Sequence, residues 1–375
     1  MLKGVRLTLM MGTAYASAVS QSVADALTSV QVTSSTEGRS GFQLTFALNS
    51  HSSQHLGFIL SKGGYLPLSR VILVVTINGV SDVIMDGVVT RHEVSPGSDG
   101  NPATITLTGE DLSRVMNYLD FSGLPYPAMP AEAQVALILA KYAALGIIPA
   151  IIPSPLIDVP LPIDQIPAQQ GKDLEYIQKL ANDVGYVFYV DPGPTPGMSL
   201  AYWGPEIQLS APQPALNVDM DAHTNVESLS FSYDGDSKKL PLVYIFNSAT
   251  KALIPIPIPD ITPFSPPLGA VPTIPLDVER IMESAKYSPV RGVLVGMALA
   301  AKTSQAVSAT GSLDIARYGR VLKARKLVGV RGAGTAYDGL YYVKSVTHNI
   351  KLGEYKQSFT LSRNGLISSV SEVTP

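Results

Sequence analysis

The feature that most constrains the fold is a weak internal repeat that links the two ends of the chain. The first copy spans residues 85–109 and the second 337–362, and each opens on an Asp-Gly pair, at Asp86 and at Asp338. The pair precedes a late leucine by 21 residues in one copy and by 23 in the other. Each copy is typical of a turn, a long strand, a loop and a returning strand. Asp-Gly turns are common before strands, so chance is the alternative. A true duplication predicts two similar β-domains in one chain.

Composition predicts a subunit that buries apolar surface against partners. The chain has 375 residues, no cysteine, 27 basic and 30 acidic residues, and only 15% charged residues against about 25% in typical domains. The length suggests about two to three domains. Without cysteine there is no disulfide framework, zinc ribbon or thiol nucleophile. The net charge of −3 argues against a general nucleic-acid binder. The mean hydropathy of +0.20 requires apolar surface to be covered, by a membrane or by other chains.

The membrane alternative fails on the length of the apolar runs. A spanning helix needs about 20 consecutive apolar residues, and the longest runs are broken by Lys141, Pro149 and Pro153. We therefore expect no stable membrane insertion. The N-terminus imitates a signal peptide, which is one interpretation of its basic and apolar residues. Apolar residues alternate at every second position over 5–11, and this pattern favours the alternative interpretation, a half-buried strand.

Both ends of the chain are expected to be rich in β-strands. Turn signals at Asn78-Gly79, Asp86-Gly87 and 96–102 separate the strands of the first end, and the GVRGAG run at 329–334 is expected to connect two strands of the last. A dinucleotide fingerprint would instead open a helix. The expected strands are 30–32, 41–47, 71–77, 83–94, 103–108, 326–331, 339–350 and 355–362.

The middle of the chain predicts an α+β insert. Helices are expected over Ala131–Leu145, ended by Gly146, and over Asp173–Val184, with Asp173 as the N-cap. Strands are expected at 186–190 and 199–203, where Trp203 should be a packing anchor. Partly helical segments are expected at 277–284 and 293–307, and a short helix that begins beside Glu110-Asp111 at 109–116.

Two proline-rich stretches, 147–167 and 253–275, are apolar rather than flexible and polar. Proline forbids central-strand pairing and favours extended backbone. Each stretch is interpreted either as a buried connector within the subunit or as an apolar arm that lies across a neighbouring subunit. The sequence leaves both interpretations open.

No active site assembles from the chemically reactive residues. The five histidines are scattered, and the pair His51 and His55 lies in a polar segment without an obvious third metal ligand. The carboxylate pairs Asp219–Asp221 and Asp234–Asp236 are better explained as solvated turns than as a glycosidase pair. We therefore expect no catalytic, cofactor-binding or metal-binding residues and no cofactor.

The central motif resembles a known family. The run 169–191, which contains DLEYIQKLA and GYVFYVD, resembles the DLEFIxRLAxxxGYxFYVD pattern of baseplate hub proteins of contractile phage tails. Late-control D proteins, the hub portion of type VI secretion spike proteins and hubs of extracellular injection systems share this pattern. The segment 338–361 resembles the closing β-domain of those hubs, and 109–112 resembles the end of their first β-domain. The resemblance covers most of the chain.

The resemblance implies an α+β, mostly β fold. Two small β-barrels similar to the tail-tube protein would flank an α+β insert, and three chains would form a pseudo-sixfold ring. The expected division is a first barrel at 1–122, an insert at 123–240, an arm with a helical connector at 241–310, and a second barrel at 311–375 completed by strands from preceding segments.

The implied function is structural rather than enzymatic. The homotrimer would join the hexameric tail tube, or a tube initiator, to the trimeric central spike. The tape-measure and baseplate wedge proteins would be further partners. DNA or cargo would pass through the channel without sequence-specific binding, past a neutral or acidic surface. The location would be the tail baseplate of a virion or injection particle, assembled in the cytoplasm of the producing bacterium. The alternatives are a cell-wall hydrolase and a glycan-binding adhesin of a tail.

Overall fold

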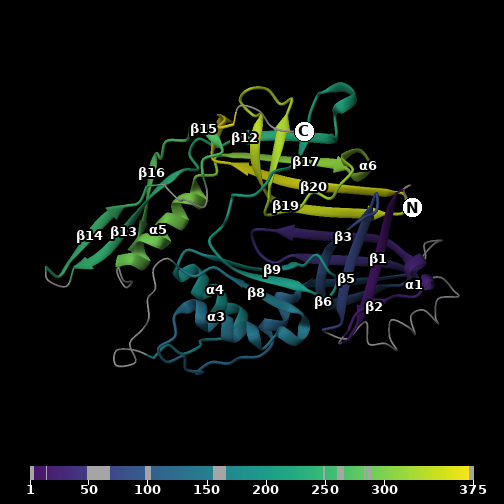
Figure 1. Ribbon diagram of the computed structural model, residues 1–375, viewed down its shortest axis with the longest axis horizontal. Helices are drawn as coiled ribbons and strands as arrows, with labels where there is room; N and C mark the ends of the chain where they lie inside the picture. The colour runs from purple at the N-terminus through teal and green to yellow at the C-terminus, as the bar shows by residue number, and fades with distance from the viewer. Residues whose placement is uncertain are drawn as a thin grey trace.

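One large sheet organises the chain. The computed structural model describes residues 4–13, 15–48, 68–97, 103–154, 166–247, 250–259, 266–282, 284 and 289–370. Thirteen strands from both ends of the chain form a single, mostly antiparallel sheet, and an α+β insert and a projecting arm attach to it (Figure 1). The fold is therefore mostly β, as the sequence predicts.

The first half of the sheet uses the N-terminal third of the chain. Its strands pair in the order β3-β4-β7-β6-β5-β1-β2. Its elements are β1 (Val5–Gly12), β2 (Ser17–Ala18), α1 (Gln21–Ala26), β3 (Leu27–Ser35), β4 (Gly41–Leu48), β5 (Arg70–Ile77), β6 (Val80–Ser95), β7 (Ala103–Asp111) and the 3-10 helix η1 (Leu112–Asn117).

The second half of the sheet uses strands from two separate segments. The strands pair in the order β12-β17-β20-β19-β18-β11, and β11 and β12 precede residue 311 in the chain. Its elements are β11 (Gln213–Asn217), the 3-10 helix η3 (Asp221–His223), β12 (Val226–Tyr233), β17 (Val307–Asp314), α6 (Ile315–Tyr318), β18 (Leu327–Arg331), β19 (Gly339–Lys351) and β20 (Glu354–Arg363). The strand β21 (Gly365–Ser368) follows β20 but lies outside this sheet.

The two halves share one topology, which confirms the duplication. In chain order, β3, β4, β5, β6 and β7 correspond to β12, β17, β18, β19 and β20, and each pairing in one half recurs antiparallel in the other. Register shifts also recur, at Thr28 and Glu227 and at Thr90 and Lys344. The edge strands differ, because β1 runs antiparallel to β5 and β11 runs parallel to β18.

The register of the duplication differs from the one that the Asp-Gly pairs predict. The bulge follows Val89 in β6 and Val343 in β19, so Asp86 corresponds to Leu340 rather than to Asp338. Asp86-Gly87 is not a turn but lies inside β6. Gly87 is required there because a Cβ would lie 2.2 Å from the Glu110 carbonyl oxygen. The second pair does end a turn, where Gly339 has a φ of +127°.

Backbone pairing between β3 and β19 joins the two halves. Residues 29–35 of β3 run antiparallel to 345–351 of β19, and Figure 1 shows the two strands side by side. The Thr33 and Thr347 hydroxyls lie 3.1 Å apart, and Lys344 Nζ donates to Glu37 Oε1 at 3.1 Å. The expectation of two separate barrels is therefore not confirmed: in the described residues the strands form one continuous sheet, and no closed barrel is found.

The α+β insert packs around its own core. Its elements are α3 (Ala131–Ala140), the 3-10 helix η2 (Ala143–Leu145), β8 (Ile147–Ile151), α4 (Asp173–Asp183), β9 (Val187–Pro192) and β10 (Ser199–Gly204). Trp203 is fully buried, and its ring contacts the edge of Tyr186 at a centroid distance of 4.9 Å. This confirms Trp203 as a packing anchor.

Several local predictions for helices need correction. The helix expected over 131–145 ends at Ala140 and resumes as η2, and Gly146 follows with a φ of +76°. Asp173 is not the N-cap of α4 but its first residue; it is buried and accepts hydrogen bonds from Tyr142 and Gln169. The short helix expected at 109–116 is η1, and Asp111 caps it by accepting the Ser113 N–H at 2.9 Å.

The arm contains β13 (Lys239–Asn247), β14 (Ala252–Pro257), β16 (Asp277–Ile281) and α5 (Pro289–Thr303), and β15 (Gly269–Pro272) pairs with β21. The helix expected at 277–284 is wrong, since β16 pairs parallel with β13. The prolines of β8 and β14 lie in edge strands, where a missing N–H is tolerated. Leu253 and Ile254 are 44% and 43% exposed, so β14 is not a buried connector. Residues 155–165 and 260–265 of the two stretches lie outside the described residues.

One buried and one partly buried ion pair fasten the insert to the two halves. The Arg70 guanidinium donates two hydrogen bonds of 2.7 Å to Asp86, and a third to the Gly197 carbonyl at 3.0 Å. Arg325, between β18 and the preceding helix, pairs with Asp191 of the insert and donates to the Ser35 carbonyl of the first half. These contacts fix three parts of the chain relative to one another.

The Arg70–Asp86 pair generates a stability prediction. Asp86→Ala leaves the 7%-exposed Arg70 side chain without its counter-charge, which costs about 3–5 kcal/mol in the free energy of unfolding. Urea unfolding followed by circular dichroism measures this loss. The control is Glu279→Ala, which removes the half-exposed pair with Lys239 and should change stability by about 0.5 kcal/mol or less. A loss below about 1 kcal/mol for Asp86→Ala would contradict the role of the pair.

A second prediction concerns acid stability. Burial lowers the pKa of His348 to about 4, below the ordinary value of 6.5, and its Nδ1 lies 2.7 Å from the Tyr355 hydroxyl. Between these pH values the unfolded chain binds a proton that the folded chain does not. The contribution of His348 to stability therefore falls as pH drops from 6.5 to 4, by about 3 kcal/mol.

The measurement compares urea unfolding of the native chain and of His348→Gln at several pH values. Burial raises the pKa of Asp111, Asp191 and Glu206, and this acts with the opposite sign in the same range. The difference between the two proteins isolates the histidine. We expect a shallower loss toward pH 4 in His348→Gln and an unchanged slope in the control Thr310→Ser, which is exposed and removes no titrating group. Equal slopes in all three proteins would refute the assignment.

Candidate functional site

The outward surface of the sheet is formed by hydroxyl and amide side chains. Apolar residues alternate with Ser, Thr, Gln and Asn along each strand, so one face packs on the core and the other faces away from it. We call this outward surface the polar face. Its members are Thr104, Thr106 and Thr108 of β7, Gln43 and Thr45 of β4, Ser29, Gln31, Thr33 and Ser35 of β3, Ser345, Thr347 and Asn349 of β19, Ser358 and Thr360 of β20, Ser308, Thr310 and Ser312 of β17, and Ser228, Ser230 and Ser232 of β12.

Strand register places these side chains in rows that cross both halves. Residues directly opposite in antiparallel strands share a face. One row contains Ser228, Ser312, Ser358, Thr347 and Thr33, each opposite the next in consecutive strands. The first two hydroxyls lie 2.9 Å apart and the last two 3.1 Å. The polar face is therefore continuous across the β3–β19 junction.

Charged residues stand at the margins of the polar face. Arg91 and Glu93 extend its rows beyond β7 and pair with each other. Lys351 lies near the hairpin at the other margin, where Lys356 pairs with Glu227 at 2.8 Å. The middle of the face carries hydroxyls and amides only. Such a surface is well hydrated, and it offers a polyanion few ammonium or guanidinium groups to replace its counterions.

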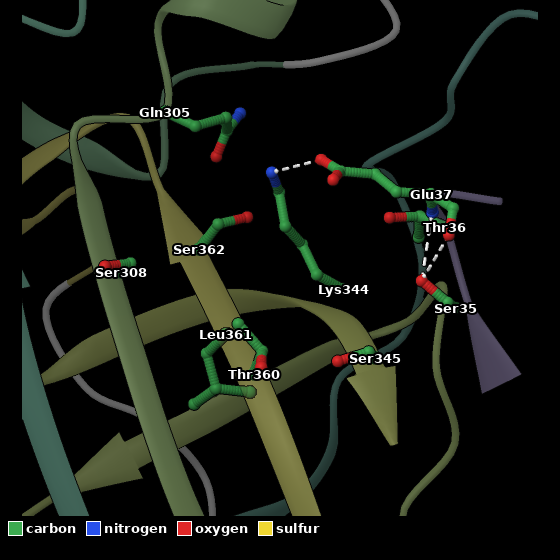
Figure 2. A pocket seen from close by; sticks show the side chains of 10 residues that line it. All are labelled: Ser35, Thr36, Glu37, Gln305, Ser308, Lys344, Ser345, Thr360, Leu361 and Ser362. Atoms are coloured by element: carbon green, nitrogen blue, oxygen red, sulfur yellow. Dashed lines mark hydrogen bonds and ion pairs between the residues drawn. The ribbon is translucent and has the colours of Figure 1, made fainter. Parts of the chain in front are cut away.

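A hollow of about 320 Å³ opens where the two halves meet, at the edge of the polar face. Figure 2 shows Lys344 reaching across it to Glu37, with Ser362 and Gln305 on the facing wall. Lys344 also lowers the pKa of Glu37 through this hydrogen bond and its charge. Because its ammonium group is already paired with a carboxylate, the hollow carries no unpaired charge from the residues that line it.

The histidines considered in the sequence analysis do not lie together in the described part of the structure. His51 and His55 lie outside the described residues. His348 is buried beside Tyr355, whereas His92 and His223 are exposed on β6 and η3. No group of three histidine or acidic side chains suited to a metal occurs in the described part of the chain.

The carboxylate pairs lie in turns. Asp219 and Asp221 both have positive φ in the connection before β12, and both are exposed. Asp234 closes a turn by accepting the Asp236 N–H at 3.0 Å. The 329–334 run connects β18 to β19, as expected, rather than opening a helix. No helix in the described ranges is long and apolar enough to cross a membrane.

Sequence reasoning missed the polar face itself. The signal is present in alternating runs such as 42–46, 105–108 and 358–362, where every second residue is Ser, Thr or Gln. The apolar members of these runs identify the strands, and the polar members identify the surface. That the runs share one surface follows only from the pairing of distant strands.

Comparisons with known proteins give the fold. No family model matches the chain, and no curated protein matches it. Several solved structures are similar over most of the chain, and three of them are described below. A tail protein from Neisseria meningitidis MC58 has a TM-score of 0.64 at 12% identity, and covers 97% of this chain and 98% of its own. The 43 kDa tail protein of prophage MuSo2 from Shewanella oneidensis has a TM-score of 0.57 at 16% identity, with 97% and 99% covered.

The third structure is the E. coli c3393 protein, described as a component of the type VI secretion system with structural similarity to the T4 bacteriophage tail proteins gp27 and gp5. Its TM-score is 0.50 at 10% identity, over 93% of this chain and 77% of that one. This chain therefore has the fold of these tail proteins, although its sequence differs from theirs at most positions.

The composition of the polar face generates a prediction about DNA. At physiological salt the native chain should not bind duplex DNA measurably. The variant Gln43→Lys, Thr310→Lys, Ser358→Lys should bind it, with log affinity falling against log salt at a slope of about −0.9 for each phosphate contacted. Fluorescence anisotropy with labelled DNA measures both. The control changes the same three residues to Asn and should not bind DNA. If the lysine variant also failed to bind, the charge of this face would not control contact with DNA.

Proposed function

We propose that this chain is the structural hub of a tail baseplate, in a contractile phage tail or a related injection machine. The observation that carries the proposal is the duplicated sheet with one continuous, uncharged polar face. The fold of tail proteins and the resemblance of the 169–191 motif to hub proteins support it. The role is structural rather than enzymatic, and the location is the tail baseplate of the particle.

Duplication explains why one chain would serve as an adaptor. Three chains with two similar halves each give a ring of six halves, which fits a hexameric tube on one side. Other parts of the chain occur three times in the same ring, and these fit a trimeric spike on the other side. The tube or tube-initiator protein, the spike, the tape-measure protein and the wedge proteins are the proposed partners.

The polar face would line the channel of this ring. DNA carries one negative charge for about every 1.7 Å of duplex axis, so a basic lining would hold it. Hydroxyl and amide side chains stay hydrated and exchange hydrogen bonds with water, so a charged polymer or an unfolded cargo can slide past them. A neutral or acidic channel surface is what the hub hypothesis expects, and the composition of the polar face supports this placement.

The arm and its exposed apolar residues suit a contact with another subunit of the particle. Phe246, Leu253 and Ile254 of the β13–β14 hairpin are 50%, 44% and 43% exposed. Clustered apolar exposure of this kind marks surfaces that other proteins cover. The proposal assigns this hairpin to the assembly without choosing among the partners.

The first experiment measures mass and shape. The purified chain, alone and co-expressed with the proteins encoded beside it, should form particles of about three times 39.8 kDa in mass photometry. Negative-stain images should show a ring of six lobes around a central hole. A chain that stays monomeric under both conditions, at the highest soluble concentration, would contradict the hub proposal.

A further inference from the structure

The open strand edges in the described part of the chain include those of β12 and of the distal part of β6. The strand β12 pairs with β17 along one edge only. The distal part of β6, from Thr90 to Ser95, lies beside β7 on one side. On its other side, the hydrogen bonds that β6 makes with β5 and the residues before it end at Val89. Exposed edges of this kind are ready to accept another strand.

These two edges correspond, in the duplicated topology, to the two strands that join the halves within the chain. We call that β3–β19 pairing the junction. The junction joins β3 to the distal part of β19. By the shared topology, β12 is the counterpart of β3, and β6 is the counterpart of β19. Each half therefore has one element of the junction engaged within the chain and the complementary element open.

We infer that β12 of one copy of this chain pairs antiparallel with distal β6 of the next copy, in the manner of β3 with β19. The inference rests on the ring of the proposed function and identifies the strands that close it. The contact is heterologous, because each copy contributes a different edge, and such contacts close into a ring when the rotation permits. The polar face then continues from copy to copy.

The bulges fix the register of this pairing. Thr28 and Glu227 align the first pair of strands, and Thr90 and Lys344 align the second. Thr33 lies opposite Thr347 in the junction, so Ser232 lies opposite Glu93 of the next copy. In the same register, Ser35 opposite Ser345 becomes Asp234 opposite Arg91, an acid facing a base.

Charged residues lie near the two open edges, as they do at the junction. Inside the chain, Glu37 just after β3 pairs with Lys344 at the bulge of β19. Asp236 occupies the position after β12 that corresponds to Glu37, and Arg91 follows the corresponding bulge in β6. In the inferred pairing, the turn that Asp234 closes within the chain faces Arg91, whose partner within the chain is Glu93.

Burial on the core side points the same way. Within the junction, Val32 and Val346 are fully buried. At the open edges, residues on the same core side of the strands are exposed instead: Val94 of β6 is 55% exposed and Tyr233 of β12 is 44% exposed. In the inferred pairing Val94 lies opposite Phe231 and Tyr233 opposite His92, so a neighbouring copy covers apolar surface that the isolated chain leaves in water.

The test uses cysteine pairs in a chain that has no cysteine of its own. A chain with Ser232→Cys is mixed with a chain with Glu93→Cys, dissociated and reassembled, and oxidised mildly. A covalent dimer containing one of each chain is expected on a non-reducing gel. The double variant should give covalent dimers and trimers, and no larger species.

Two controls calibrate the cross-link. Thr33→Cys with Thr347→Cys should form a bond within one chain, because it copies the geometry of the observed junction. Ser230→Cys with Glu93→Cys places the cysteines two residues out of register, and the larger separation between their Cα atoms should slow cross-linking by about tenfold or more.

A second variant tests the charges. Asp234→Arg with Asp236→Arg should weaken assembly by about tenfold or more in mass photometry, and adding Arg91→Glu should restore it. Circular dichroism checks that each variant folds.

The outcomes separate the inference from the proposed function. Six-lobed rings that form without the in-register cross-link, or that cross-link equally out of register, overturn the strand pairing and leave the hub proposal standing. A double variant whose only cross-link lies within one chain also overturns the pairing. Absence of any ring contradicts the hub proposal itself.

Discussion

The backbone pairing of β3 with β19 is the constraint on which the rest of the structure depends. It joins residues such as Thr33 and Thr347, which are 314 positions apart in the chain, and it turns two similar sheets into one. Because strand register fixes which side chains share a face, this one ladder also makes the polar face continuous. Without it, each half would present a separate small polar patch.

Buried and partly buried charges then hold the insert against that ladder. Arg70 and Asp86 reach the insert from the first half, and Arg325 contacts the insert, the second half and the backbone of β3. The guanidinium of Arg325 also stacks 4.0 Å from the ring of Tyr189. Buried pairs of this kind are sensitive to position, so they favour one relative placement of the three parts over others.

Local patterns in the sequence predict the individual elements well where the pattern is strictly local. Alternation identifies most strands, Gly146 ends its helical segment, and Asn78-Gly79 forms the turn between β5 and β6. The errors arise where a distant partner decides. Residues 277–281 become a strand because β13 lies beside them, and Asp173 turns inward to Tyr142 and Gln169 rather than capping its helix. The polar face could be predicted strand by strand, but its continuity needs the β3–β19 pairing.

The unlike edge strands of the two halves have a consequence for the symmetry of any assembly. The outer strand is antiparallel in the first half and parallel in the second, although the inner five strands agree. In a ring of such chains, the inner strands repeat at every half, whereas the outer edges alternate between two kinds. A protein that contacts the inner strands meets six similar positions around the ring. A protein that contacts the outer strand of one kind meets only three. Different strands of the same sheet thus have sixfold and threefold repetition in the ring.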